Sequence, residues 1–318
     1  MDILHKAREK QTIGSSVLCL TGWAVFGWGK ALAAEQETTA ANHTPSRIVA
    51  VGDLHADIDH ALQTLQMAGI VDGDGHWMAG DSILVQTGDI TDRGPDSLEV
   101  ITLLRRLQTE AKDANGAVYP LLGNHEAMNL LGDWRYVSEA DVADFGSVEA
   151  RQAAFSLDGE LGSWLSQLDA VKQIDGTVFL HGGVAPTWSQ FTAEELSQQV
   201  RTAIINYPSG KNASGSILGS DGPLWFRGYL TGDPNAVCGP LQLVLAQMGA
   251  HRMVVGHTTQ RSGEVAVRCN GALLGIDTGI SAHYGGHHSA VEIKNGDAQA
   301  IYSSGRKDLP DPAKQLTQ

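Results

Sequence analysis

The sequence predicts an α/β layered fold, and two observations lead to that prediction. Short apolar runs typical of buried strands alternate with segments that have helical spacing or helix-favouring composition. Five of the six runs are followed closely by glycine and by Asp, Asn or His, and α/β sheets gather ligand sites at such strand ends. The runs predict strands at 47–51, 82–86, 117–122, 177–180, 252–255 and 272–276, and helices are expected at 57–68, 97–111, 194–205 and 241–248.

The chain has 318 residues, 42% of them hydrophobic, which permits one large domain or two small ones. From Ser46 onward no low-complexity stretch, repeat or break in composition is visible. We therefore expect a polar, flexible linker at 35–45 and a single domain over 46–318. A mostly helical insertion is expected at about 133–170. Its aromatic residues are explained by packing, although the segment could also overhang a site.

The first 34 residues resemble a cleaved export signal. Lys6, Arg8 and Lys10 precede an uncharged stretch at 11–29, and Ala31-Leu32-Ala33 supplies the small-x-small pattern that signal peptidase cleaves. An uncleaved anchor is the alternative, but the stretch is short and broken by glycine for a span of about 20 residues. We expect a signal peptide at 1–34, a periplasmic or secreted protein, and no stable membrane span after cleavage.

Cysteine usage and charge limit the compartment and the partners. Cleavage would remove Cys19 and leave Cys238 and Cys269, an even pair suited to an oxidising space. The sequence is compatible with a disulfide between these two cysteines and also with two free, buried thiols. The formal net charge of -14 argues against sequence-independent binding of a nucleic-acid duplex, which needs a basic surface. Any phosphate site must therefore be made locally positive by arginines or metal ions.

The residues that follow the predicted strands form a set of candidate metal ligands. Carboxylate, amide oxygen and imidazole together suit first-row divalent metals such as Mn, Fe or Zn, whereas Mg²⁺ and Ca²⁺ prefer all-oxygen ligands. Two such ions about 3.5–4 Å apart can share one carboxylate and hold a bridging hydroxide for attack on phosphorus. The motifs are Gly52-Asp53-Leu54-His55, Gly88-Asp89-Ile90-Thr91-Asp92-Arg93-Gly94, Gly123-Asn124-His125-Glu126, His181-Gly182-Gly183 and Gly256-His257.

In this order, the five motifs resemble those of the PPP-type branch of calcineurin-like metallophosphoesterases, and more narrowly the bacterial Shewanella-like protein phosphatases. The resemblance covers residues 52–257, and its second and third motifs are highly specific. It implies a β-sandwich flanked by helices, with the ligands on loops at the carboxyl ends of strands. It also implies two bound divalent metal ions and hydrolysis of phosphomonoesters.

Carried over residue by residue, the resemblance assigns roles to eleven positions. His125 would be the general acid that protonates the leaving oxygen, and Asp92 would orient it. Asp92 could instead be a turn residue, and Arg227 a structural arginine on a turn rich in Trp and Tyr. The implied metal ligands are Asp53, His55, Asp89, Asn124, His181 and His257, and the implied substrate-binding residues are Arg93, Arg227 and Tyr284.

Three further residues carry expectations that geometry can test. Ala56 stands where the family's first motif usually has glycine, which is tolerable if its backbone angle is ordinary. Glu126 is expected to steady neighbouring side chains, and Asp277 to have a supporting or structural role.

The substrate expected from the resemblance is a phosphorylated protein. A nucleotide or another small phosphate ester is the alternative for the same site. A metal-holding envelope protein without turnover is a third reading, and it is disfavoured because a scaffold has no need of His125, Asp92 and Arg93 together.

Overall fold

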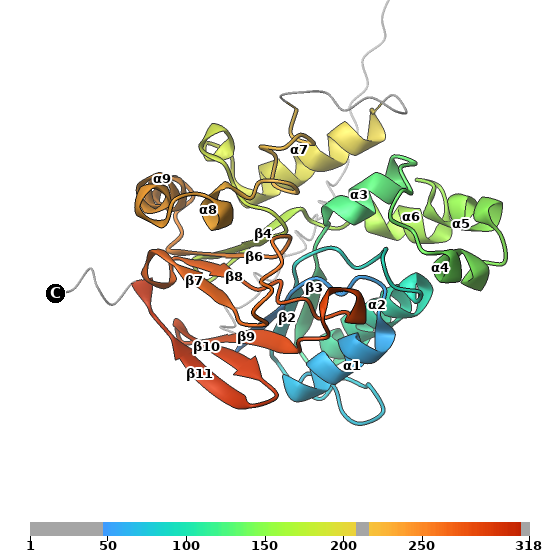
Figure 1. Ribbon diagram of the computed structural model, residues 1–318, viewed down its shortest axis with the longest axis horizontal. Helices are drawn as coiled ribbons and strands as arrows, with labels where there is room; N and C mark the ends of the chain where they lie inside the picture. The colour runs from blue at the N-terminus through green and yellow to red at the C-terminus, as the bar shows by residue number, and fades with distance from the viewer. Residues whose placement is uncertain (1–46, 208–215, 313–318) are drawn as a thin grey trace, which may run out of the picture. The chain divides into compact units, whose positions relative to one another are not determined.

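Two β-sheets and the helices that cover them make up the computed structural model of the protein, which describes residues 47–207 and 216–312 (Figure 1). The expected signal peptide and linker lie outside the described residues. The six-stranded sheet has the order β11-β10-β9-β1-β2-β3, and the five-stranded sheet has the order β4-β5-β6-β8-β7. The strands are β1 (Ile48–Val51), β2 (Ile83–Gln86), β3 (Ala117–Pro120), β4 (Val171–Ile174), β5 (Thr177–Leu180), β6 (Arg252–Val255), β7 (Ala266–Arg268), β8 (Leu273–Gly275), β9 (Ser289–Lys294), β10 (Asp297–Tyr302) and β11 (Gly305–Leu309).

The direction of the central strands sets the position of the site. Strands β1, β2 and β3 are parallel, as are β5, β6 and β8. Each of these sets therefore delivers its carboxyl ends to one edge of its sheet. The remaining pairings are antiparallel and add strands at the outer edges.

Alternating side chains on the central strands pack against two different layers, as the two-residue period of a strand requires. Ala50 of β1, Phe179 of β5 and Val254 of β6 point into the core between the two sheets. Val49 and Val51 of β1 point the other way, into a second core. Both faces of these strands are thus buried, which explains why their sequences read as continuous apolar runs.

Helices cover the outer face of each sheet (Figure 1). Helices α1 and α2 pack on the six-stranded sheet, and α7 and α9 pack on the five-stranded sheet. Asp57 caps the amino terminus of α1 by accepting a hydrogen bond from the His60 N–H. The bounds are α1 (Ile58–Met67), α2 (Ser97–Asp113), α3 (Asn124–Leu130), α7 (Ala193–Ile205), α8 (Gly228–Thr231) and α9 (Pro234–Gln247), with 3₁₀ turns η1 (Pro186–Trp188), η2 (Cys269–Gly271) and η3 (Ala282–Tyr284).

The segment 133–170 contains three short helices, α4 (Glu139–Asp144), α5 (Val148–Phe155) and α6 (Glu160–Leu165). Phe155 is fully buried, and its ring lies 5.8 Å from that of Phe145, so these aromatics pack as expected. Over the part of the chain that the structure describes, no helix combines the length and hydrophobicity needed to cross a membrane.

The six predicted strands correspond to β1, β2, β3, β5, β6 and β8, and the sequence analysis missed the other five. One available signal was Asn295-Gly296 between β9 and β10, since both residues have positive φ, as a two-residue hairpin turn requires. The structure also resolves the question about the cysteines. Cys238 of α9 and Cys269 of η2 form a disulfide.

Candidate active site

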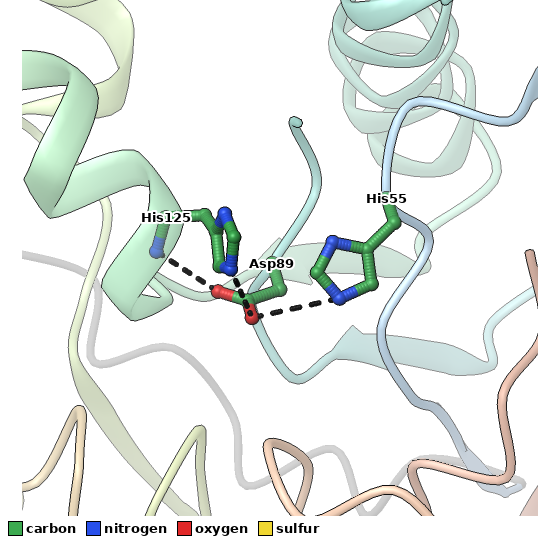
Figure 2. Close-up of side chains that lie close together, drawn as sticks. All are labelled: His55, Asp89 and His125. Atoms are coloured by element: carbon green, nitrogen blue, oxygen red, sulfur yellow. Dashed lines mark hydrogen bonds and ion pairs between the residues drawn. The ribbon is translucent and has the colours of Figure 1, made fainter. Parts of the chain in front are cut away.

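Asp89, which follows β2, lies at the centre of the candidate site. The Nε2 atoms of His55 and His125 lie 3.7 Å and 3.8 Å from its Oδ2 atom. Both imidazoles point toward this carboxylate, one from the segment after β1 and one from α3 (Figure 2). All three side chains are buried, and their ligand atoms are close enough together to share one metal ion.

A second group of ligands shares the same carboxylate. Asp89, His181 and His257 bring their ligand atoms close enough to hold a second ion. The Nε2 atom of His181 lies 3.2 Å from Asp89 Oδ1 and 2.9 Å from the amide oxygen of Asn124. The other nitrogen of His181, Nδ1, pairs with the backbone oxygen of Thr87 at 2.8 Å, which fixes the ring orientation.

Asp53 completes the set of predicted ligands. One of its carboxylate oxygens lies 3.9 Å from His55 Nε2, and both oxygens accept from the backbone N–H of His257. Burial and the nearby carboxylates of Asp277 and Asp89 raise the pKa of Asp53 well above its usual range. This crowding of carboxylates is the arrangement that a bound cation would relieve.

Two imidazoles of the site, those of His55 and His257, are held in the neutral form that binds metal. Burial lowers the pKa of His55 to about 3, and burial together with the neighbouring His181 lowers the pKa of His257 to about 2. Both rings are therefore neutral at physiological pH. Burial opposes charge on Asp89, but the imidazoles of His181 and His125 lower the pKa of this carboxyl well below its usual range.

The residues present fit two divalent metal ions. The buried His257 Nε2 atom has no hydrogen-bond partner among the described residues, although it points into a polar site. A buried nitrogen without a partner is costly unless it binds a ligand such as a metal. One bridging carboxylate, one amide and several imidazoles form a donor set typical of first-row transition metals.

His125 and Asp92 form a hydrogen-bonded pair beside these ligands. His125 Nδ1 lies 2.8 Å from Asp92 Oδ2, and the Asp92 side chain is fully buried. Burial opposes a charged imidazole, but the carboxylates of Asp89 and Asp92 outweigh burial and raise the pKa of His125. The other ring nitrogen of His125, Nε2, faces Asp89, so the ring lies between the metal ligands and its carboxylate partner.

The three predicted substrate residues lie at the rim of the site. Arg93 stacks over the ring of Tyr136 at 4.0 Å, and its Nε atom is buried without a hydrogen-bond partner among the described residues. Arg227 is exposed and donates to the backbone oxygen of His257. The ring of Tyr284 lies 4.7 Å from that of His55. The structure thus brings all eleven predicted site residues to one region.

The comparisons with known proteins agree with this geometry. The family model for calcineurin-like phosphoesterases matches residues 46–261, which is well over half of the chain. The chain belongs to this family. It is a phosphoester hydrolase with two candidate metal sites.

Relatives of this phosphoesterase include named protein phosphatases. An uncharacterized protein of Schizosaccharomyces pombe is 35% identical over 81% of this chain and 80% of its own length. Shewanella-like protein phosphatase 2 of Arabidopsis thaliana is 28% identical over 74% of this chain and 72% of its own. The structure of a cold-active protein tyrosine phosphatase from a psychrophilic Shewanella species superposes with a TM-score of 0.73, at 28% identity, over 83% of this chain and 80% of the other. These similarities confirm the family resemblance and the fold expected from the motifs.

Glu126 supports the backbone of the phosphoesterase site rather than the neighbouring side chains alone. Its carboxylate accepts from the backbone N–H groups of Asp89, Ile90, Thr91 and Gly123 and from the Thr91 hydroxyl, over 2.8–2.9 Å. Gly123 approaches so closely that a Cβ there would collide with the backbone nitrogen of Asp89. Asn124 and His125 lie in the first turn of α3. The expected loop position is therefore wrong for the metal ligand Asn124.

The structure changes the expectation about Ala56 and agrees with the one about Asp277. The backbone angle of Ala56 is not ordinary, because its φ of 51° lies in the left-handed region that favours glycine. Asp277 accepts from the Gly279 N–H with Oδ1, while its Oδ2 has no hydrogen-bond partner in the described part of the chain. It lies near enough to Asp53 to affect the pKa of that ligand, which fits a supporting role.

The sequence analysis missed three residues that contact the site: Asn129, Tyr136 and Arg151. Asn129 lies four residues after His125, so a helix that begins at Asn124 places both side chains on one face. The four-residue spacing was visible in the sequence, but it indicates a contact only if a helix is known to begin at Asn124. Tyr136 and Arg151 belong to the insertion, and nothing in their sequence surroundings points to the site.

Proposed function

We propose that the protein hydrolyses phosphomonoesters of phosphorylated proteins, with His125 as general acid. The observation that carries the proposal is the buried His125–Asp92 pair beside Asp89, the residue that both candidate metal groups share. His125 lies close enough to His55 and Asp89 to bind an ion with them, but we assign its Nε2 atom to proton transfer and assign Asp53, with His55 and Asp89, to the first ion. Metal ions bound to these ligands supply an activated water and neutralise phosphate charge. The protein's own residues then have to hold the phosphate and deliver a proton to the leaving oxygen.

His125 can deliver that proton from Nε2. In the imidazolium form, Nδ1–H donates to Asp92 Oδ2, which fixes the ring and stabilises its charge. Transfer of the Nε2 proton neutralises the leaving oxygen as the phosphorus–oxygen bond breaks. The resulting neutral imidazole regains a proton from water before the next turnover.

Arg93 and Arg227 are the proposed phosphate-binding residues. A guanidinium matches two phosphate oxygens with two parallel N–H donors, and it holds its charge at every physiological pH. Arg227 is oriented by the backbone oxygen of His257, and Arg93 by the ring of Tyr136. We propose that Tyr284, beside His55, contributes its phenol to the same oxygens.

A protein substrate is supported by the exposure of the rim and by the relatives. Arg227 is exposed and Tyr284 and Arg93 are half-buried, which suits a phosphate carried on a larger molecule. Two of the similar proteins are named as protein phosphatases, and one of these as a protein tyrosine phosphatase. A nucleotide or small phosphate ester is the alternative for the same residues.

A substrate panel tests this proposal. The purified protein, with and without added Mn²⁺, is assayed against phosphotyrosine, phosphoserine and phosphothreonine peptides and against nucleotides. We expect the highest kcat/KM for a phosphopeptide, and a fall in activity for His125→Asn. A clear preference for nucleotides would support the alternative. No activity toward any ester, or full activity in both Asp89→Asn and His125→Asn, would contradict the proposal.

Metal identity and location are also proposals. We propose that Mn, Fe or Zn occupies the site, since availability decides among metals that suit these ligands. We further propose export with cleavage of the leader, and the Cys238–Cys269 disulfide supports an oxidising compartment. Elemental analysis of the isolated protein tests the first proposal. Amino-terminal sequencing of the exported protein tests the second, which an intact leader would contradict.

A further inference from the structure

Asp92 and Arg93 have a backbone conformation that residues with a Cβ rarely adopt. Their φ angles are 69° and 73°, so two consecutive non-glycine residues lie in the left-handed region. Such a conformation is costly and persists only when the surrounding structure holds it in place. The turn carries both the partner of His125 and a proposed phosphate-binding arginine, so its exact shape matters for the site.

The helical insertion contacts this turn at several backbone positions. The backbone oxygen of Tyr136 accepts from the Arg93 N–H at 3.0 Å. The Ser138 hydroxyl donates to the Gly94 oxygen at 2.9 Å. Asp141 of α4 accepts from the Ser97 N–H, where α2 begins, at 2.9 Å. Three residues of the insertion therefore bind the chain between Arg93 and Ser97.

Arg151 of α5 adds a side-chain contact to the same turn. Its Nη2 atom lies 3.5 Å from Asp92 Oδ1, and its Nη1 donates to the Asn129 oxygen at 2.7 Å. Its Nε donates to Asp141 Oδ2, also at 2.7 Å. The guanidinium stacks on the ring of Phe155 at 4.2 Å, and only 3% of the residue is exposed. A buried arginine with two carboxylate neighbours and an aromatic face has little freedom to move.

Asn129 connects Arg151 to the catalytic pair. Because Arg151 donates to the amide oxygen of Asn129, the amide nitrogen must face the other way, toward Asp92. That nitrogen donates to Asp92 Oδ1 at 2.9 Å and to the His125 backbone oxygen, also at 2.9 Å. With Oδ1 held by Asn129 and Arg151, the second carboxylate oxygen is left to bind His125 Nδ1.

We propose that Arg151 is a positioning residue that fixes the Asp92 carboxylate, and through it His125, from the helical insertion. The proposal rests on the proposed role of His125 as general acid. Arg151 touches neither a metal ligand nor the substrate-binding residues, so its effect must pass through Asn129 and Asp92. The insertion would then serve as the support of the catalytic turn, in addition to the packing of its aromatics.

This role predicts which substrates suffer when Arg151 is lost. A loosely held Asp92 leaves His125 poorly aligned for proton transfer, while the metal ligands and phosphate-binding residues are unchanged. Substrates with a basic leaving oxygen, such as phenyl phosphate, depend on the general acid. Those with a good leaving group, such as p-nitrophenyl phosphate, depend on it far less.

The test measures kcat and KM of Arg151→Met and Arg151→Lys with both esters. We expect kcat for phenyl phosphate to fall about 100-fold in R151M, within the range that general acid catalysis contributes. The fall for p-nitrophenyl phosphate should be about tenfold smaller, with KM nearly constant for both esters. We expect kcat of R151K to lie between the values of R151M and the wild type. Arg252→Met is the matched control, because Arg252 is also a buried arginine but donates to backbone oxygens of Gly271 and Gly296, and its carboxylate neighbour at 3.7 Å is Asp311, which is not a site residue. R252M should change kcat by the same factor for both esters.

A second variant guards against loss of folding. The double substitution Asp141→Asn with Arg151→Met removes the guanidinium and one of its carboxylate partners together, so fewer buried charges stay unpaired. In the double variant, kcat should again fall more for phenyl phosphate than for p-nitrophenyl phosphate, by the same ratio as in R151M. If kcat falls by the same factor for both esters in all Arg151 variants, as expected for R252M, Arg151 has a structural role only and the proposal is overturned.

A measurement without turnover separates this proposal from the proposed function. In the metal-free protein, the proton between His125 Nδ1 and Asp92 should give a downfield ¹H NMR signal, assigned by its loss in His125→Asn. We expect R151M to broaden or shift this signal, while R252M leaves it unchanged. An unchanged signal in R151M contradicts the positioning role. A wild-type protein that hydrolyses no ester contradicts the proposed function instead, even if the signal responds to R151M.

Discussion

The carboxylate of Glu126 accepts a 2.9 Å hydrogen bond from the backbone N–H of Asp89. One helix therefore holds the residue that both candidate metal groups share, since Glu126 lies in the first turn of α3. The same carboxylate accepts from the next two backbone N–H groups and from that of Gly123. Two motifs that are far apart in the sequence are thus joined by one fully buried side chain.

Replacing Glu126 with Gln should strongly destabilise the protein. An amide has only one acceptor oxygen, and its NH₂ group would face backbone donors that the carboxylate now satisfies. We expect a loss of about 3 kcal/mol in the free energy of unfolding, measured by urea denaturation. Glu160→Gln is a suitable control because that side chain is 77% exposed, so its change should stay within about 0.5 kcal/mol. Equal stability of E126Q and the wild type would contradict the assignment.

Replacing Asp89 with Asn should remove metal and activity together. Asp89 belongs to both candidate metal groups, so an amide there weakens both. Loss of a residue that only supports a ligand already costs about 10- to 100-fold in metal affinity or activity. We expect a larger loss for D89N, with less than half of the wild-type metal content by elemental analysis. Wild-type metal content in D89N would show that Asp89 is not the shared ligand.

Replacing Arg227 with Lys should impair the use of phosphate esters. Lys keeps the charge but loses the paired donors, and a charged hydrogen bond contributes about 1.5–3 kcal/mol. We therefore expect kcat/KM to fall about 10- to 100-fold. Arg135→Lys serves as the control, since Arg135 is exposed and pairs with Asp133. If both variants lose the same activity, Arg227 has no special role in phosphate binding.

Glu292 predicts a pH dependence of stability. It lies on β9 and pairs with Arg47 before β1 and with Arg306 of β11, at 2.7 Å and 2.6 Å. Partial burial opposes its charge, but the two arginines outweigh burial and lower the pKa of Glu292. Because the folded pKa is below the unfolded one, the stabilisation is present above the unfolded pKa and is lost as the pH falls through the folded value.

Glu292→Gln should therefore destabilise the protein by about 1 kcal/mol at pH 7. The difference from the wild type should shrink as the pH falls below the unfolded pKa of about 4.3. Denaturant unfolding at several pH values measures this difference. A constant difference at all pH values would mean that the charge of Glu292 does not contribute.

Loss of the Cys238–Cys269 disulfide should also lower stability. The bond closes a loop with a sequence separation of 31 residues, for which chain entropy gives about 3–4 kcal/mol. We expect a loss of about that size for the double Cys→Ser variant, and the same loss for the wild type under reducing conditions. A reducing agent should have no further effect on the double variant. If the double Cys→Ser variant and the reduced wild type are both as stable as the oxidised wild type, this expectation is wrong.

Local sequence was sufficient to locate most of the site. Strands β1, β2, β5 and β6 are buried along nearly their whole length, so they appear as apolar runs, and the ligands follow closely at their ends. Asp53, Asp89 and His257 could be placed for that reason. The strands β9 to β11 were missed, although Asn295-Gly296 marked one hairpin, because charged and polar residues interrupt their apolar residues and no continuous apolar run results.

The fold class, the family motifs and the chemistry of the ligand set could be predicted from the residues alone, because these features depend on residue type and on order along the chain. The contacts that support the site could be found only in the folded chain. Glu126 accepts hydrogen bonds from backbone groups that precede it by more than thirty residues, and Arg151 contacts Asp92 from helix α5. Hydrogen bonds between residues so distant in the chain leave no periodic pattern, and only the folded arrangement brings the partners together.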